Sequence, residues 1–398
     1  MNNPKIRVRW LYLFVGVIAM LFAGVLYAWS ILKSPLAAAF GWSISALALN
    51  FTLAMSFFCI GGLLGARLSK RFGHRIALVI AGCLSAAGFL WTAALQGTSV
   101  TVLFLSYGVL AGCGIGIAYN VIISTVSAWF ADKKGLCSGF LMMGFGASAL
   151  LLGNVADSLF KSSFGWRYTY VLLGSGICAV LWLAGLILRK PDAQAAPAPK
   201  AAQASAGDMT TGQMLRRPSF WMAFVCISFL AAVGSSVISF AKDLALTVKA
   251  PESLAVSLVG VLSVCNGVGR ILTGVCFDAL GRRKTMLWAN ILTICAAAVV
   301  LIAVSAGSLS LCITGLCLTG MSYGACPTIT AAFTSSFFGM KHFPTNMALM
   351  TFTVMGGSLI ATASNKILEL TGGYTATFSM LLGLTVVALI LNVFIRRP

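Results

Sequence analysis

Twelve long apolar runs, separated by short polar turns, constrain this 398-residue chain more than any other feature. A helix of about 20 apolar residues crosses the roughly 30 Å hydrocarbon core of a bilayer, and the runs have that length. The runs form two groups of six and lie near residues 10–32, 44–66, 75–95, 100–130, 134–157, 167–188, 219–241, 253–279, 284–306, 308–338, 343–367 and 374–395. The pattern predicts an all-α membrane protein with twelve transmembrane helices in two pseudo-symmetric six-helix bundles and a cavity between the bundles.

The composition also indicates a membrane-spanning chain. Hydrophobic residues make up 59% of it and charged residues 9%, whereas an ordinary soluble domain has about 25% charged residues. The net charge of +19 could suggest a nucleic-acid partner, but the basic residues lie in short turns between apolar runs. We therefore expect the lipid bilayer, and no nucleic acid, as the macromolecular partner.

The basic residues predict an orientation. Of the 27 Lys and Arg, a minority lies in the turns on one side of the membrane, namely Lys33, Lys161, Arg167, Lys242, Lys249 and Lys366. Arg270 lies inside a run, and all the others fall on the side that holds both termini. Because basic loops stay in the cytoplasm, we expect a multi-pass protein of the plasma (inner) membrane with both termini cytoplasmic.

A polar connector separates the two groups of runs. Its middle is rich in Ala and Pro and has too few apolar residues to bury a core, which is typical of a flexible linker. We expect an N-terminal six-helix bundle over residues 1–188, a cytoplasmic linker over 189–218 and a C-terminal six-helix bundle over 219–398. We expect the functional unit to be a monomer.

The two groups are related by a constant sequence offset. Gly73 and Gly281 each lie in the turn after the second run of their group, and 281 − 73 = 208. The same offset relates Arg75 to Arg283, Gly116 to Gly324 and Phe130 to Phe338. Parallel repeats of this kind build transporters whose binding site lies in mid-membrane between the halves.

Arg270 is a charge deep inside an apolar run. It precedes Asp278 by eight residues, which places it about 12 Å from the charged end of its helix. An arginine at a helix centre costs at least ~2.5 kcal/mol to insert, so it normally faces a polar cavity and has a partner. None of the eight acidic residues lies in mid-run, and a guanidinium matches a carboxylate bidentately. We interpret Arg270 as an anion-binding residue; the alternative is an arginine bound to backbone carbonyls at a broken helix.

The sequence offers no catalytic or metal-binding constellation. Its two histidines, His74 and His342, lie in short basic turns, and the twelve cysteines are scattered through apolar runs without a CxxC pair. We therefore expect no metal, no cofactor and no enzymatic activity.

A motif follows the second run of the second group. It reads G-x3-D-x2-G-R-R, at Gly274, Asp278, Gly281, Arg282 and Arg283. The glycines permit a tight turn, and the aspartate can bind a basic residue or the N-terminus of a neighbouring helix. The motif resembles the signature cytoplasmic loop of the major facilitator superfamily, and this resemblance implies that these residues form a gating loop.

The corresponding turn of the first half is degenerate. It keeps a glycine, Gly73, and a base, Arg75, but Lys70 stands at the acidic position. A purely structural turn is the alternative to a gating hinge, and the two interpretations agree because a gating hinge is itself a structural turn.

A set of short segments indicates a narrower relationship. They are Tyr27-Ala-Trp29-Ser30, Phe40-Gly-Trp42-Ser43, Trp129 to Gly135, Gly165-Trp166-Arg167, Arg217 to Trp221, Lys242-Asp243 and Asn266 to Arg270. As a set they resemble the oxalate/formate antiporter family, whose members exchange small carboxylates. The resemblance implies that Arg270 binds the substrate carboxylate and that Tyr27, Tyr119 and Tyr323 line the pocket, although ordinary packing is an equal alternative for each tyrosine.

Two positions depart from the oxalate-handling members of that family. Those members carry a lysine in the eleventh span, where this chain has Met355, and a tryptophan in the tenth span, where it has Thr319. A dianion such as oxalate requires two cations in a pocket of low dielectric constant. With Arg270 alone, we expect a monocarboxylate such as formate, lactate or pyruvate.

These observations predict a secondary active transporter of small organic anions that works by alternating access and exchange. Oxalate/formate antiport, proton-coupled carboxylate symport and efflux of an amphipathic compound remain as alternatives within transport. A transporter-like membrane sensor is an alternative of another class, which the lack of a sizeable soluble signalling domain disfavours.

Overall fold

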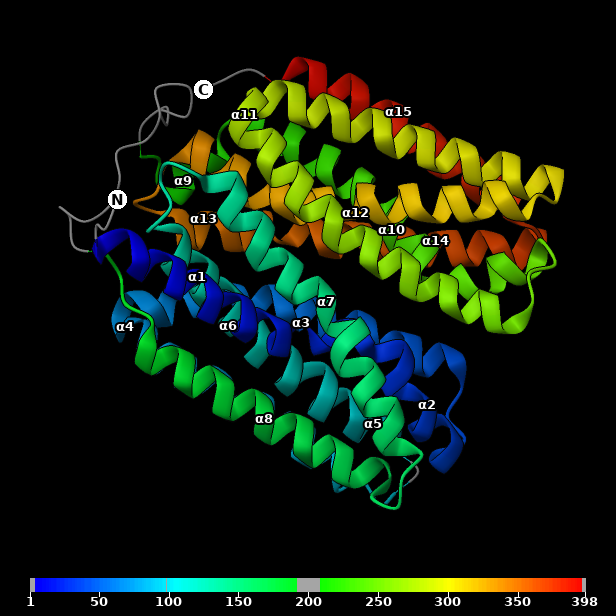
Figure 1. Ribbon diagram of the computed structural model, residues 1–398, viewed down its shortest axis with the longest axis horizontal. Coiled ribbons are helices and arrows are strands. Elements are labelled where there is room, and N and C mark those ends of the chain that lie inside the picture. Colours follow the sequence, from blue (N-terminus) through cyan, green and yellow to red (C-terminus); the bar gives the residue numbers. More distant parts are fainter. Residues whose placement is uncertain (1–3, 98, 192–207, 396–398) are drawn as a thin grey trace. The chain divides into compact units, whose positions relative to one another are not determined.

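The computed structural model describes residues 4–97, 99–191 and 208–395, and within these ranges the chain consists of helices and turns without a strand (Figure 1). The chain divides into two compact units. Unit 1 comprises residues 1–132, 140–199 and 343–349, and unit 2 comprises residues 133–139, 200–342 and 350–398. The boundaries expected from the sequence, at residues 188 and 219, stay a prediction.

Unit 1 takes most of its helices from the first half of the chain. In order they are α1 (Pro4–Ala23), the 3-10 segment η1 (Gly24–Ala28), α2 (Trp29–Phe40), α3 (Ile44–Arg71), α4 (Gly73–Ala93), α5 (Val100–Leu103), the π-helical segment η2 (Phe104–Ala111), α6 (Gly112–Ser127), α7 (Lys134–Phe160) and α8 (Gly165–Ile187). Within this unit α4 packs against α8, and α3 packs against α6.

Unit 2 takes most of its helices from the second half of the chain. In order they are α9 (Thr211–Leu215), α10 (Pro218–Thr247), α11 (Glu252–Ala306), α12 (Leu309–Phe338), α14 (Phe352–Thr371) and α15 (Tyr374–Phe394). The short helix α13 (Phe343–Met350) follows α12 in the chain, but its residues 343–349 belong to unit 1. α11 packs along α12 and α15, and α10 packs against α14.

Eleven helices within the described residues are long and apolar enough to cross a membrane. One of them, Ser257–Ala306 in α11, has 50 residues and would measure about 75 Å, which is more than twice the thickness of a bilayer core. Its backbone leaves helical geometry at Gly281, so its two arms correspond to the apolar runs 253–279 and 284–306. The expected all-α membrane fold is therefore confirmed, with α11 providing two of the twelve expected crossings.

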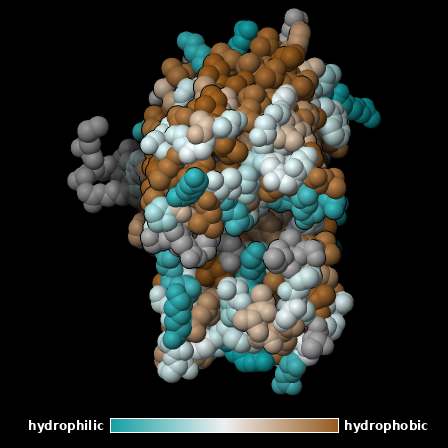
Figure 2. All heavy atoms as spheres, turned by 90° about the vertical axis from the view of Figure 1, so that its right-hand side faces the viewer, coloured by the Kyte–Doolittle hydropathy of each residue, from teal (hydrophilic) through white to brown (hydrophobic). Residues whose placement is uncertain are grey.

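Large apolar side chains are exposed on the surface. Phe14 is 63% exposed, Leu186 is 68% exposed and Leu370 is 74% exposed. Apolar residues also occupy much of the face that Figure 2 draws. Soluble monomers rarely expose apolar surface on this scale, whereas lipid chains cover it in a membrane protein.

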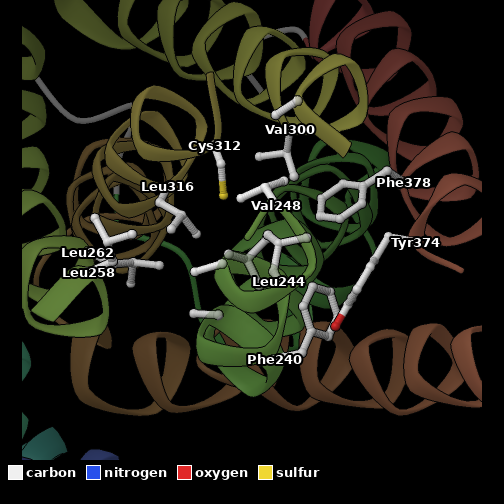
Figure 3. Packing of buried hydrophobic residues seen from close by; sticks show 14 of the residues in the cluster. Phe240, Leu244, Val248, Leu258, Leu262, Val300, Cys312, Leu316, Tyr374 and Phe378 are labelled. Carbon is white, nitrogen blue, oxygen red and sulfur yellow. The ribbon is translucent and has the colours of Figure 1, made fainter. Parts of the chain in front are cut away.

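The core of unit 2 lies where four helices meet (Figure 3). It is formed by Phe240 and Leu244 of α10, Val248 directly after α10, Leu258, Leu262 and Val300 of α11, Cys312 and Leu316 of α12, and Tyr374 and Phe378 of α15. The ring of Phe240 lies 5.1 Å from that of Tyr374, centroid to centroid, at a residue where α10 itself leaves helical geometry. Close packing of this kind, rather than water exclusion, holds membrane helices together.

The expected linker is described only in part, since residues 192–207 lie outside the described ranges. Its last part contains the short helix α9, which composition did not indicate. Thr210 and Gln213 form a capping box at the start of α9, and the Lys341 backbone N–H donates to Asp208 at 3.0 Å. This end of the linker is therefore attached to unit 2.

Two turn glycines that are related by the offset of 208 residues both have a positive backbone φ. Gly73 has φ of 86° and Gly281 has φ of 75°, and both are in the left-handed region. A Cβ at either position would have open space around it, so the backbone conformation, and not packing, is what requires glycine.

Candidate functional site

Arg270 lies on the first arm of α11 and is 1% exposed, which makes it the largest fully buried side chain of the described residues. Its Nε donates to Oδ1 of Asn266, one helical turn earlier, at 2.9 Å. Asn266 is itself 5% exposed. The guanidinium is therefore oriented by a neutral amide from its own helix.

The backbone around Arg270 is held by close contact with α12. A Cβ on Gly324 of α12 would meet the carbonyl of Asn266 and the amide of Arg270, and a Cβ on Gly269 would meet the backbone of Met321. The Thr328 hydroxyl donates to the Arg270 carbonyl at 3.4 Å. Glycine at these positions lets the two helices approach backbone to backbone, which fixes the turn that carries Arg270.

Two of the expected pocket residues lie on α12. Tyr323 is 7% exposed, and its ring packs against Gly234 of α10. Thr319 is fully buried, and its hydroxyl donates to the carbonyl of Gly315 at 2.8 Å. The hydroxyl of Thr319 is thus hydrogen-bonded within its own helix.

Met355 lies on α14 and is half-buried. α14 packs mainly against α10 and α15, and the next residue, Gly356, packs against Ser228 of α10. The turn of α14 that carries Met355 is therefore positioned by α10.

Tyr27 and Tyr119 meet in unit 1 through an aromatic cluster, which we define as Tyr27, Phe58, Tyr119 and Phe145. The ring of Phe145 on α7 lies 5.1 Å from Tyr27 and 5.2 Å from Tyr119, edge to face in both cases. Phe58 of α3 lies 4.8 Å from Tyr119. These geometries are favourable for aromatic pairs and fix the two tyrosines against one another.

The hydroxyl of Tyr119 lies 3.2 Å from Sδ of Met142, also on α7. Tyr119 is 5% exposed, whereas Tyr27 is half-buried. A thioether sulfur is a weak acceptor, so this hydroxyl can exchange its contact for a better acceptor such as a carboxylate oxygen.

The structure thus brings together two subsets of the residues that the sequence indicated. Tyr27 and Tyr119 share one aromatic cluster in unit 1, and Arg270 and Tyr323 lie on neighbouring packed helices in unit 2. Sequence reasoning missed the roles of Asn266 and Phe145. The spacing of four between Asn266 and Arg270 could have indicated the first, but nothing in the sequence distinguishes Phe145 from a lipid-facing phenylalanine.

Among the expected gating residues, Asp278 makes the most specific contacts. Its carboxylate accepts the backbone N–H of Gly135 at 2.9 Å and that of Leu136 at 2.8 Å. Those residues form the first turn of α7, so Asp278 caps the positive end of that helix. The helix N-terminus is thus a partner of this aspartate, and a basic residue, Lys134 at the start of α7, also interacts with it electrostatically.

The basic residues of the two turns differ in their surroundings. Arg282 donates through Nη2 to the carbonyl of Ile395 at 3.1 Å, just past the end of α15, and lies over the ring of Phe337. Arg75 and Arg283 are exposed. Arg282 therefore attaches α11 to α15, while the other two arginines face outward.

Metal chemistry has no evident ligand set in the described part of the chain, where no three His, Cys, Asp or Glu side chains lie together as a metal ion would need. All twelve cysteines are free thiols.

Comparison with known proteins gives consistent matches. The sequence matches the family described as Major Facilitator Superfamily over residues 11–362 and 224–398. It is 33% identical over 300 residues to the oxalate:formate antiporter of Oxalobacter formigenes, a match that covers 72% of this chain and 69% of that protein. It is 36% identical over 132 residues to monocarboxylate transporter 11 of Homo sapiens, over 33% of this chain and 26% of that protein. Among solved structures, the proton:xylose symporter XylE bound to 6-bromo-6-deoxy-D-glucose has a TM-score of 0.70 at 16% identity, over 97% of this chain and 96% of that one.

Proposed function

This chain belongs to the major facilitator superfamily, and we propose that it transports small carboxylate anions across the membrane. Its relatives are transporters and not enzymes. The observation that carries the proposal is Arg270, a permanently charged side chain that is 1% exposed inside a membrane-spanning helix. Burial of such a charge is costly, and an anionic substrate compensates the cost whenever it is bound.

The proposed substrate is a monocarboxylate of the formate, lactate or pyruvate type. Arg270 provides one positive charge, and the sequence has methionine at 355, where a second cation would favour a dianion. The similarity to an oxalate:formate antiporter and to a monocarboxylate transporter supports a carboxylate in general. Tyr27, Tyr119 and Tyr323 would donate hydroxyls to the carboxylate or exclude water from it.

The proposed mechanism is exchange by alternating access. Each reorientation would pass through an occluded state in which Arg270 is shut off from water. Bound anion neutralises the guanidinium and makes that state accessible, whereas the empty site keeps a buried charge without the substrate anion. Exchange is therefore expected to be much faster than net movement in one direction.

Two other transport reactions are retained as alternatives. Oxalate/formate exchange is favoured by the 33% identity to an antiporter of that name. Proton-coupled symport is the second alternative, because a carboxylate substrate can carry its own proton.

We further propose that the protein acts as a monomer in the plasma (inner) membrane, with both termini in the cytoplasm. The distribution of basic residues supports this orientation.

Exchange in reconstituted vesicles tests the function. Vesicles are loaded with unlabelled formate, lactate, pyruvate or oxalate, and entry of the same labelled anions is followed for the wild type and for Arg270→Gln. We expect saturable monocarboxylate entry and a loss of about 100-fold in the variant, because truncation of one partner of a buried charged pair costs several kcal/mol. Lys366→Gln is the matched control, since it removes one positive charge from an exposed ion pair of the same unit.

The outcomes separate the alternatives. Strong oxalate exchange would favour the antiporter alternative over the monocarboxylate. An unaffected Arg270→Gln variant would contradict a role for this arginine in substrate binding. Equal rates of entry into empty and loaded vesicles would contradict obligatory exchange.

A further inference from the structure

The neutral partner of Arg270 is a feature that the proposed function does not yet explain. We propose that Asn266 is a positioning residue that orients the guanidinium without neutralising it, so that the site binds a substrate carboxylate without competition from a carboxylate of its own. This inference rests on the proposed transport of carboxylates and deepens it by naming the residue that orients the charged side chain.

The geometry supports a specific and not an incidental contact. Nε of Arg270 donates to Oδ1 of Asn266 at 2.9 Å, between two side chains that are 1% and 5% exposed. A spacing of four residues places both side chains on the same face of α11. A hydrogen bond from a charged donor in a site shielded from water is among the stronger ones in a protein.

The contact also determines which part of the guanidinium meets the substrate. With Nε donating to Asn266, the edge of the guanidinium that carries Nε is directed at Asn266 and not at the substrate. Asn266 would thereby orient the fork of donors before the substrate arrives, and preorganisation of this kind increases affinity.

The helix that carries the pair cannot easily shift to another arrangement. The backbone of α12 packs against the backbone of this turn at Gly320 and Gly324, where an added Cβ would meet atoms of Asn266 or Arg270. The relative position of Asn266 and Arg270 is therefore set by helix packing, and a change of residue at 266 changes chemistry more than geometry.

Asn266 is neutral, and an aspartate at the same position would not be. Aspartate has nearly the same shape and would accept the same hydrogen bond, but it would form a buried ion pair with Arg270. Such a pair satisfies both charges internally, so an incoming anion would have to compete with a carboxylate already in place. Asparagine provides the orientation without the competition.

Three variants separate orientation from charge: Asn266→Ala removes the hydrogen bond, Asn266→Asp keeps it and adds a negative charge, and Asn365→Asp is the control. Asn365 lies on α14 of the same unit and bonds to Ser239, so its replacement adds one negative charge outside the proposed site. The KM and maximal rate of formate exchange are measured in loaded vesicles. Thermal stabilisation of the detergent-purified protein by formate is measured in parallel, because it reports binding without transport.

We expect KM to rise about tenfold in Asn266→Ala with little change in maximal rate, since one hydrogen bond to a charged group is lost. In Asn266→Asp we expect KM to rise at least ~100-fold and formate to lose its stabilising effect, because the new carboxylate compensates the charge of Arg270. The unliganded Asn266→Asp protein should melt no lower than the wild type. The Asn365→Asp control should match the wild type in all three measurements.

The KM values of the two Asn266 variants, relative to the wild type, test the proposed role of Asn266. If Asn266→Asp retained the wild-type KM while Asn266→Ala lost affinity, Asn266 would be a geometric support only, and the charge argument would be wrong. If both variants matched the wild type, Asn266 would have no positioning role. If the wild type were neither stabilised nor driven to exchange by any of the four carboxylates, the proposed function would fail first, and this inference with it.

Discussion

Asp278 of α11 accepts a hydrogen bond from the backbone N–H of Gly135 at 2.9 Å, and the two residues are 143 positions apart in the sequence. The second carboxylate oxygen accepts from Leu136. A side chain in the turn at the end of one helix thus caps the first turn of another, α7, where unpaired amides carry partial positive charge.

Replacement of Asp278 by alanine should lower the stability of unit 2 by about 1–2 kcal/mol, because α7 loses both its cap and a favourable charge at its N-terminus. The measurement is the melting temperature of the purified protein in detergent. Asp157→Ala is the matched control, since Asp157 forms an exposed ion pair with Lys161 and should contribute less than about 1 kcal/mol. Equal effects of the two variants would contradict the capping role.

Gly274 should not tolerate a methyl group. A Cβ there would meet the carbonyl group of Gly135, whose own Cβ position is likewise blocked by the Gly274 carbonyl. We expect Gly274→Ala to cost on the order of 1–3 kcal/mol, since the two backbones must separate. The loss would appear as a lower melting temperature.

Gly260 provides the control on the same helix. A Cβ at this position has nothing within 4 Å, and the residue lies inside α11. Gly260→Ala should therefore be neutral or should stabilise by up to about 1 kcal/mol through helix propensity. Destabilisation by Gly260→Ala as large as that by Gly274→Ala would show that close approach is not the cause.

Two buried tyrosines of unit 1 should respond differently to loss of the hydroxyl. Tyr170 donates to the carbonyl of Leu32 at 2.9 Å, whereas the hydroxyl of Tyr107 has no hydrogen-bond partner among the described residues. Tyr170→Phe should destabilise by about 1 kcal/mol, and Tyr107→Phe should be neutral or stabilising. Each variant loses a single oxygen atom, and the measurement compares their melting temperatures with that of the wild type. A larger loss of stability in Tyr107→Phe than in Tyr170→Phe would contradict this prediction.

Tyr119→Phe should weaken substrate binding and leave the fold intact. The aromatic cluster keeps its ring contacts with Phe58 and Phe145, so only the hydroxyl is lost. If that hydroxyl donates to a carboxylate, the KM for exchange should rise about tenfold. Tyr12→Phe is the control, because Tyr12 packs against Trp129 outside the cluster and should leave KM unchanged.

The fold was largely predictable because the bilayer admits few solutions. Apolar runs of spanning length, the turn glycines Gly73 and Gly281 and the offset between them were sufficient for the helices and the duplication. The π-helical segment Phe104–Ala111 and the helix Thr211–Leu215 were not predicted. The first has no compositional mark in an apolar run, and the second depends on a cap within a polar linker.

Only the charged residues of the candidate site could be predicted from the sequence. Arg270 was proposed as a candidate because a buried guanidinium is costly, and Asp278 because of its motif, and their functional roles stay predictions. Phe145, which joins Tyr27 to Tyr119, is one of 26 phenylalanines in the chain, and only the tertiary packing distinguishes it. Whether a residue in an apolar run faces lipid or a neighbouring helix is decided by contacts between elements distant in the sequence.

The neutral amide beside Arg270 has a consequence for voltage. A guanidinium that carries one positive charge and binds a monocarboxylate forms a loaded site with no net charge, and a membrane potential does no work on a neutral site that changes sides. The potential acts with about 2.3 kcal/mol per elementary charge at 100 mV, so a site that carried a second carboxylate at position 266 would move net charge whenever it was loaded. One-for-one exchange of monoanions moves no net charge over a full cycle, and asparagine at this position would in addition make each crossing of the loaded site independent of the membrane potential.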